Sequence, residues 1–387
     1  MSLRQLATWA VLSLLGIAGV LGVLSLSDRA SQASEATWSA LGDGATEDRL
    51  MPEARAMHRG APLSVDPFLQ FATLSEDETR FDALSSHARR LNRRSDRNAI
   101  LRLERDIAAG RLRDAVREVE LLARIDPDNY ATYIEDLGVF GALPATREIV
   151  FEAMEACPGW IRNFVSNNIV LLGEAPRPQI LRGIEIQSRV CDDPKLTRQL
   201  LRDYLERLAG LGRYGDAAVV MDRAASILGL PEPEGLIRND AFQGEAALPP
   251  FDWSFSDTAR ASADYDRGRG GAFATYRGTD RETLLSQIIV LPTTGRLRFE
   301  YRGRHRHDPR SGGFTWRLEC LPLGRALMNV PLGNELQPET PVIEIFAAGG
   351  ESCRFARLSF EGRPGELMRR ISADLTSVSL AVEATVR

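Results

Sequence analysis

The amino-acid sequence predicts a multidomain α + β protein in which a helical repeat precedes an antiparallel β-sandwich. Three observations predict this fold class. Apolar residues recur at spacings of three and four over residues 67–230, which is typical of amphipathic helices. Beyond residue 233 they alternate with polar residues in short runs bounded by glycine and proline, which is typical of strands. Ahead of both parts, residues 6–26 form an apolar segment without a charge.

The apolar segment predicts where the chain resides. As a helix it would be roughly 30 Å long, enough to cross a bilayer. Arg4 precedes it and acidic residues follow it, so the positive-inside rule places the N-terminus in the cytoplasm and the bulk in the periplasm. We therefore expect residues 1–26 to be a single-pass transmembrane anchor in the inner membrane. The alternative is a signal peptide cleaved after residues 31–33, which would release the chain into the periplasm.

The next two parts differ in pattern. Residues 27–62 sustain no apolar period and contain small polar residues, which predicts a flexible tether. In residues 63–235, the segment GRLRDA at 110–115 recurs as GRYGDA at 212–217, an offset of 102 residues, or three periods of about 34. Such a period of paired helices resembles the tetratricopeptide repeat. The resemblance implies stacked helix pairs whose concave surface binds a protein partner. The alternative is a spacer that only positions the next domain.

The small-residue position of this repeat marks where its two helices approach closely. Ala115 and Ala217 occupy it in the first and last copies, whereas the two middle copies have Ile149 and Gly183. The middle copies are therefore degenerate.

Residues 240–387 predict a β-sandwich of the jelly-roll type. Leu297, Phe299 and Tyr301 alternate with charged neighbours, which predicts a strand with one buried and one solvated face. The expected strands lie at residues 251–255, 272–276, 284–291, 297–301, 314–321, 342–346, 353–360 and 378–384.

Three segments of this region resemble jelly-roll modules of carbohydrate-binding type: PFDW at 250–253, QIIVLP at 287–292 and FTWRLEC at 314–320. With the anchor and the degenerate repeats, the chain is similar to exported repeat proteins of Alphaproteobacteria associated with exopolysaccharide or O-antigen production. The resemblance implies a polysaccharide as partner of the β domain and an envelope protein as partner of the helical repeat. It implies no reaction.

Sugar binding requires flat aromatic rings beside fixed polar groups. Trp253, Trp316 and Tyr276 are the candidate rings, with core packing as the alternative for each. The arginine-rich stretch 296–310 supplies candidate polar groups, because guanidinium forks match carboxylates and phosphates. Its candidate ligand residues are Arg298, Arg302 and Arg304, with a solvated strand face as the alternative.

The four cysteines predict two different states. Cys320 and Cys353 lie in the same predicted domain, and we expect them to form a disulfide. Cys157 and Cys191 are 34 residues apart, so they occupy equivalent positions in neighbouring repeats. Stacked helices lie about 8–10 Å apart, beyond the roughly 7 Å that a disulfide bridges. We therefore expect these two to be unpaired buried thiols.

Several functions are disfavoured. The net charge of −5 argues against a nucleic-acid partner. His305 and His307 lie beside Arg304 and Arg306, which repel a cation, so no metal or other cofactor is expected. Zinc, phosphate-loop and nucleophile-elbow motifs are absent from the sequence. The sequence thus predicts a non-enzymatic scaffold and binding protein. The alternatives are an envelope protein-assembly factor whose β domain binds protein, and a glycan-processing enzyme, since glycosidases need only two carboxylates.

Overall fold

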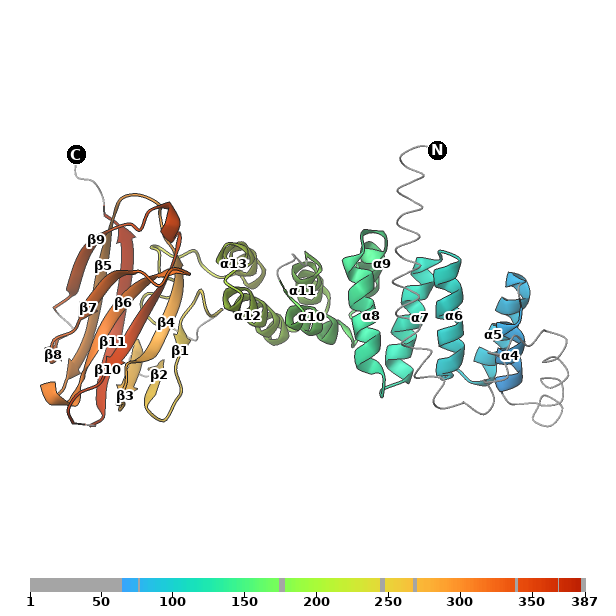
Figure 1. Ribbon diagram of the computed structural model, residues 1–387, viewed down its shortest axis with the longest axis horizontal. Helices are drawn as coiled ribbons and strands as arrows, with labels where there is room; N and C mark the ends of the chain where they lie inside the picture. The colour runs from blue at the N-terminus through green and yellow to red at the C-terminus, as the bar shows by residue number, and fades with distance from the viewer. Residues whose placement is uncertain are drawn as a thin grey trace. The chain divides into compact units, whose positions relative to one another are not determined.

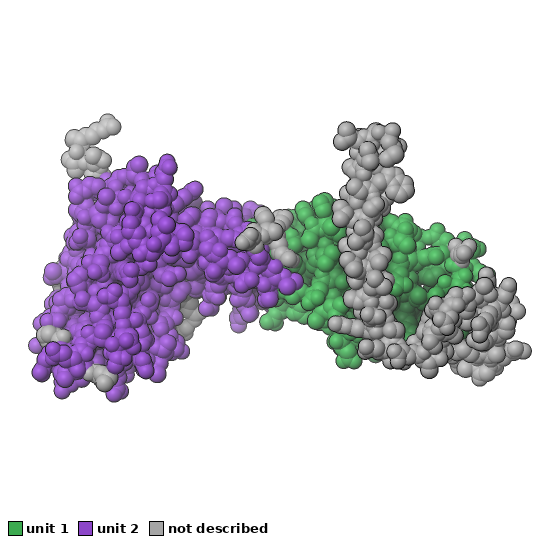
Figure 2. Space-filling view, in the orientation of Figure 1, with its two compact units in different colours: residues 1–168, 177–190 green, residues 169–176, 191–387 purple. Residues whose placement is uncertain are grey.

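The computed structural model describes residues 65–383 apart from 76, 174–177, 244–247, 267–269, 338–339 and 368. The expectations for residues 1–26 and 27–62 therefore lie outside the described residues. The chain divides into two compact units, residues 1–168 with 177–190 and residues 169–176 with 191–387 (Figure 2). The second unit contains the last two helices as well as the β-sandwich.

The expected inner-membrane localisation is corrected by the length and hydropathy of the described helices. In the described part of the chain, no helix is both long enough and apolar enough to cross a membrane. The segment that suggested the anchor lies outside that part.

Helices occupy the chain from residue 66 to residue 228 (Figure 1). Several of them begin with a capping side chain that accepts a hydrogen bond from a free backbone N–H group. Asp77 accepts a hydrogen bond from Thr79 N at 2.9 Å, and Asp193 accepts one from Leu196 N at 2.9 Å. The helices are α4 (Asp66–Thr73), α5 (Glu78–Leu91), α6 (Asp96–Ala108), α7 (Leu112–Ile125), α8 (Tyr130–Ala142), α9 (Pro144–Met154), α10 (Ile161–Val170), α11 (Pro178–Val190), α12 (Pro194–Gly210) and α13 (Tyr214–Leu228).

The helices follow one another at intervals close to the expected period. Helices α6, α8, α10 and α12 begin at residues 96, 130, 161 and 194. The two predicted turns share a conformation, because Gly110 and Gly212 have φ angles of +71° and +72°, a region that glycine enters without steric cost. Ala115, Gly183 and Ala217 are buried. Leu143 alone separates α8 from α9, whereas three residues separate α6 from α7. The shorter turn shifts this copy out of the frame of the 34-residue repeat.

A buried charge joins three helices of the first unit. Glu118 on α7 is 5% exposed. It accepts hydrogen bonds from Arg89 on α5 and from Arg102 Nε on α6, the latter at 3.1 Å. Buried carboxylates require such partners, because an uncompensated charge in the interior is strongly destabilising.

The expectation of unpaired buried thiols at Cys157 and Cys191 is wrong. Both residues are disulfide-bonded, and no described cysteine is free. Each lies in the turn after a helix, Cys157 beyond α9 and Cys191 directly after α11. The spacing between stacked helix axes does not govern the position of such turn residues. Cys157 is also exposed rather than buried.

The predicted antiparallel sandwich is confirmed as two sheets (Figure 1). The five-stranded sheet has the order β1-β4-β10-β6-β7, and the six-stranded sheet has the order β2-β3-β11-β5-β8 with β9 also paired to β5. The strands are β1 (Ser254–Phe255), β2 (Ala261–Tyr265), β3 (Ala272–Tyr276), β4 (Glu282–Val290), β5 (Arg296–Arg306), β6 (Gly313–Leu321), β7 (Ala326–Pro331), β8 (Glu335–Leu336), β9 (Val342–Ala347), β10 (Phe355–Arg363) and β11 (Ile371–Val382).

The chain ahead of β1 belongs to the sandwich. Ile237 and Phe242 are 2% and 1% exposed within its core. The side chain of Gln287 on β4 donates to Arg238 O at 3.0 Å and accepts from Arg238 N at 3.1 Å. Leu236 N donates to Leu380 O at 2.9 Å. The sandwich therefore begins near residue 235.

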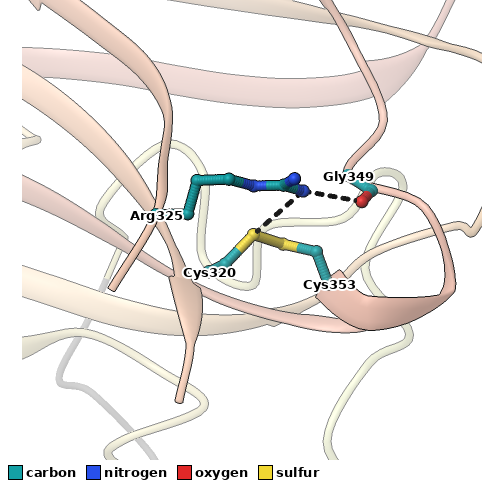
Figure 3. Close-up of a disulfide and its surroundings, with 4 residues drawn as sticks. All are labelled: Cys320, Arg325, Gly349 and Cys353. Carbon is teal, nitrogen blue, oxygen red and sulfur yellow. Dashed lines mark hydrogen bonds between the residues drawn. A yellow bond between two sulfur atoms is a disulfide. The ribbon is translucent and has the colours of Figure 1, made fainter. Parts of the chain in front are cut away.

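The expected disulfide between Cys320 and Cys353 is present, with 5.3 Å between the Cα atoms (Figure 3). It ties the end of β6 to the turn before β10. The guanidinium of Arg325 lies against this bridge and donates a hydrogen bond to Gly349 O at 2.8 Å. The disulfide thus links two neighbouring strands of the five-stranded sheet at one end of the sandwich.

Candidate functional site

The three aromatic rings singled out in the sequence lie in the core. Trp253 and Trp316 are fully buried, and Tyr276 is 1% exposed. The two indole rings pack 6.1 Å apart between the sheets. A ring without exposed surface cannot stack on a ligand, so the predicted role as binding platforms is corrected for all three. Core packing, the alternative reading, is what the structure shows.

The candidate arginines lie on the outward side of β5. Their neighbours in the strand, Phe299 and Tyr301, point into the core, as the period of two requires. Arg298 and Arg302 both bind the Glu300 carboxylate, at 3.1 and 2.9 Å. Hydrogen bonds from Arg298 and then Arg302 lower the pKa of Glu300, because they favour its charged form.

A row of side chains crosses four strands of the same face. The register places Phe273 on β3 between Asp264 on β2 and Asp374 on β11. Asp374 in turn lies opposite Arg304 on β5, and the two form an ion pair at 2.8 Å. The Phe273 side chain is 40% exposed, which is unusual for a large apolar ring. The row therefore presents one aromatic ring between fixed charged groups.

We call the outward side of β2, β3, β11 and β5 the open face. Apart from the row through Phe273 and the arginines of β5, it carries small hydroxyl groups, which offer hydrogen bonds without obstructing the surface. These hydroxyl residues are Ser262, Ser372, Ser377 and Ser379.

The two histidines within the arginine-rich stretch, His305 and His307, pack in the sandwich. His305 is 3% exposed, and its Nε2 lies 2.8 Å from Gly333 O. The two imidazoles stack with centroids 5.4 Å apart. Burial lowers the pKa of both, because it disfavours the charged imidazolium. Among the described residues, no group of three or more metal-ligating side chains is brought together.

Sequence reasoning missed Phe273, although its strand was expected at residues 272–276. A period of two places Phe273 and Tyr276 on opposite faces of β3, so only one of them can reach the core. The neighbouring Ala272 and Ala274 gave no signal of which face is buried. The pairing of β3 with β11 decides which face is buried, and β11 is the last strand of the sandwich, far from β3 in sequence.

Comparison with known proteins gives structural likeness only. No family model matches the chain, and no curated protein is significantly similar to it. Several solved structures similar to the sandwich are carbohydrate-binding modules. TmCBM61 in complex with beta-1,4-galactotriose is 16% identical, with 39% of this chain and 100% of that chain covered and a TM-score of 0.26. A module of the Cellvibrio mixtus lichenase 5A in complex with cellotriose is 13% identical (34% and 92% covered, TM-score 0.23).

A third such structure is the CBM22-1 xylan-binding domain from Paenibacillus barcinonensis Xyn10C. It is 12% identical, with 38% of this chain and 94% of that chain covered and a TM-score of 0.26. At these identities and TM-scores no residue and no ligand transfers to this chain. The function is therefore argued from the side chains of the open face.

Proposed function

We propose that the β-sandwich binds a polysaccharide along its open face, without a catalytic role. The observation that carries this proposal is the exposed ring of Phe273 between Asp264 and Asp374, with Arg304 next in the row. Sugar rings present apolar C–H faces and hydroxyl edges. An aromatic ring packs against the former, while carboxylates and guanidiniums bind the latter.

The dimensions of the open face suit a chain rather than a single sugar. Neighbouring strands lie about 4.8 Å apart, so the row across four strands spans roughly 14 Å. The hydroxyl groups of β11 and the arginines of β5 continue the polar surface along the strands. Arg298 and Arg302 remain candidates here, because their pairing with Glu300 fixes the guanidiniums in place.

The helical part is proposed to dock a protein partner as a tetratricopeptide-like array. The recurring glycine turns at Gly110 and Gly212 and the buried small residues Ala115 and Ala217 support this relationship. With a glycan on the sandwich and a protein on the helices, the chain would act as a scaffold for polysaccharide synthesis or export.

The test is glycan-array binding by the full chain and by a Phe273→Ala variant. Removing the ring should weaken binding to the recognised polysaccharide about tenfold, the effect of losing about 1.4 kcal/mol of contact energy. Val290→Ala is the matched control, because Val290 is 39% exposed on the other sheet. A triple Arg298/Arg302/Arg304→Ala variant should weaken binding to anionic polysaccharides most.

The proposal fails if the folded protein binds no polysaccharide, or if Phe273→Ala binds as tightly as Val290→Ala. The first outcome would favour a protein ligand for the sandwich.

A further inference from the structure

A cavity of about 400 Å³ lies at the end of the sandwich opposite to the Cys320–Cys353 disulfide. At this end four connections pass from one sheet to the other, at residues 277–281, 307–312, 332–334 and 364–370. All four reach the cavity, together with the strand ends beside them. They line it with Arg281, Gly312, Gly313, Leu332, Asn334 and Pro364, and the last residue of β10, Arg363, completes the wall.

The charges around the cavity leave one guanidinium uncompensated. Arg281 Nε lies 3.6 Å from Oε2 of Glu361, a buried carboxylate whose Oε1 accepts a hydrogen bond from Ser359 at 3.0 Å. Arg363 has no ion-pair partner in the described part of the chain, and its buried Nε makes no hydrogen bond there. The two arginines and one glutamate together carry a net charge of about +1.

The walls of the cavity are held by close backbone packing. A Cβ atom on Gly312, whose φ is +106°, would lie 2.3 Å from Arg363 O. A Cβ atom on Gly365 would lie 2.1 Å from Gly312 N. Leu367 N also donates to Arg310 O at 2.8 Å. The loops that form the cavity are therefore in place before any ligand arrives, which lowers the cost of ordering them on binding.

We propose that this cavity binds the carboxylate of an acidic sugar, so that the glycan recognised by the sandwich contains uronic acid. This inference rests on the proposed polysaccharide binding and adds the chemical class of the glycan. The planar guanidinium of Arg363 matches a carboxylate through two parallel hydrogen bonds. A local charge of about +1 is balanced by a monoanion, whereas a phosphate dianion would leave a negative excess. The Asn334 amide at the rim can bind a sugar hydroxyl.

The experiment is calorimetric titration of the full chain, at constant ionic strength, with oligosaccharides of glucuronate, galacturonate and alginate. Each is compared with its carboxyl-reduced counterpart, which keeps the linkages and loses the charge. We expect one acidic series to bind, and its reduced form to bind at least about tenfold more weakly, because a charge-assisted pair is lost. This comparison needs no variant and is independent of folding effects.

Variants of Arg363 test whether the carboxylate of the bound sugar lies in the cavity. Arg363→Gln should lose about tenfold in affinity for the acidic oligosaccharide and little for the reduced one. Arg363→Lys should recover only part, because it keeps the charge and loses the fork. Arg357→Gln is the matched control, since Arg357 lies exposed on the same strand at its other end. Thermal unfolding confirms that each variant is folded.

Four outcomes overturn the inference. Equal binding of acidic and reduced forms, or unchanged affinity in Arg363→Gln, excludes the cavity while polysaccharide binding by the open face still stands. If inorganic phosphate displaces the acidic oligosaccharide at equal concentration, the cavity binds a phosphate group and not a carboxylate. The absence of binding to any acidic or neutral saccharide removes the proposed function itself, and the inference with it.

Discussion

Trp316 shows how one residue can mislead a search for a binding site. Its ring contacts Phe299, Tyr301 and Phe360 with centroids 5.7, 5.5 and 4.9 Å away, and none of its surface is exposed. Trp316→Ala should therefore lower the free energy of unfolding by about 3–5 kcal/mol, as a large core cavity does. Its loss of glycan binding would report unfolding rather than a contact.

Trp316→Phe is the informative companion. The indole Nε1 is buried and makes no hydrogen bond among the described residues, so replacing it strands no partner. We expect a loss of only about 1–2 kcal/mol. Urea denaturation of both variants measures the difference, and an alanine variant as stable as the phenylalanine variant would contradict the core role.

The buried His305 and the half-buried His307 predict a pH dependence of stability. Burial lowers the pKa of His305 and His307 from the usual 6.5, so both are neutral in the folded protein near pH 7. Below pH 6.5 the unfolded chain binds protons that the folded chain does not. The free energy of unfolding therefore decreases as the pH is lowered.

Between pH 7.5 and 5.5 a single such histidine contributes at most about 1.4 kcal/mol to this fall. Urea titrations at the two pH values measure it, with His307→Gln as the comparison. That variant should lose less stability than the wild type over this range, by at most about 1.4 kcal/mol. An identical fall in both proteins would show that His307 does not cause the effect.

At the scale of elements, Glu118 predicts how the first helices depend on one another. It binds arginines of α5 and α6 from its place on α7. Glu118→Ala leaves two guanidiniums without their buried partner and should cost about 3 kcal/mol. Arg117→Ala is a suitable control, because its pair with Asp114 is exposed and contributes less than about 1 kcal/mol. Equal costs for the two variants, measured by urea unfolding, would contradict a role for burial.

The predictable elements are those whose local pattern is strong. Strand β5 was expected from Leu297, Phe299 and Tyr301, because the period of two exposes which face is buried. Strand β2 was missed because its alanines and serine carry little apolar signal. Strand β7 was missed because it ends in Pro331, and proline in a sequence usually indicates the end of a strand. An edge strand such as β7 tolerates a proline.

The candidate sites were less predictable for a different reason. Arg281 and Arg363 are 82 positions apart in sequence and meet only because four connections cross between sheets at one end. No local spacing encodes such a meeting. The arginines of β5, by contrast, were recognised because they belong to one strand, and their exposure followed from its alternation.

At the scale of the whole molecule, the two units carry separate cores, and the sandwich core reaches back beyond its first strand. Residues 231–387 should therefore fold more stably than residues 240–387. The shorter fragment loses the buried side chain of Ile237 and the backbone hydrogen bond from Leu236 to Leu380. It also leaves the Gln287 amide, 1% exposed, without Arg238 as its partner.

These losses amount to about 3–5 kcal/mol: roughly 2 for the side chain and 1–3 for the buried amide. Urea unfolding of both fragments, followed by tryptophan fluorescence, measures the difference as a lower midpoint for the shorter one. Ile237→Ala in the longer fragment should reproduce about half of it, while Leu323→Ala, which is 62% exposed and outside the core cluster, should not. Equal midpoints for the two fragments would mean that the sandwich closes without this segment, and that a binding assay on residues 240–387 reports the native domain.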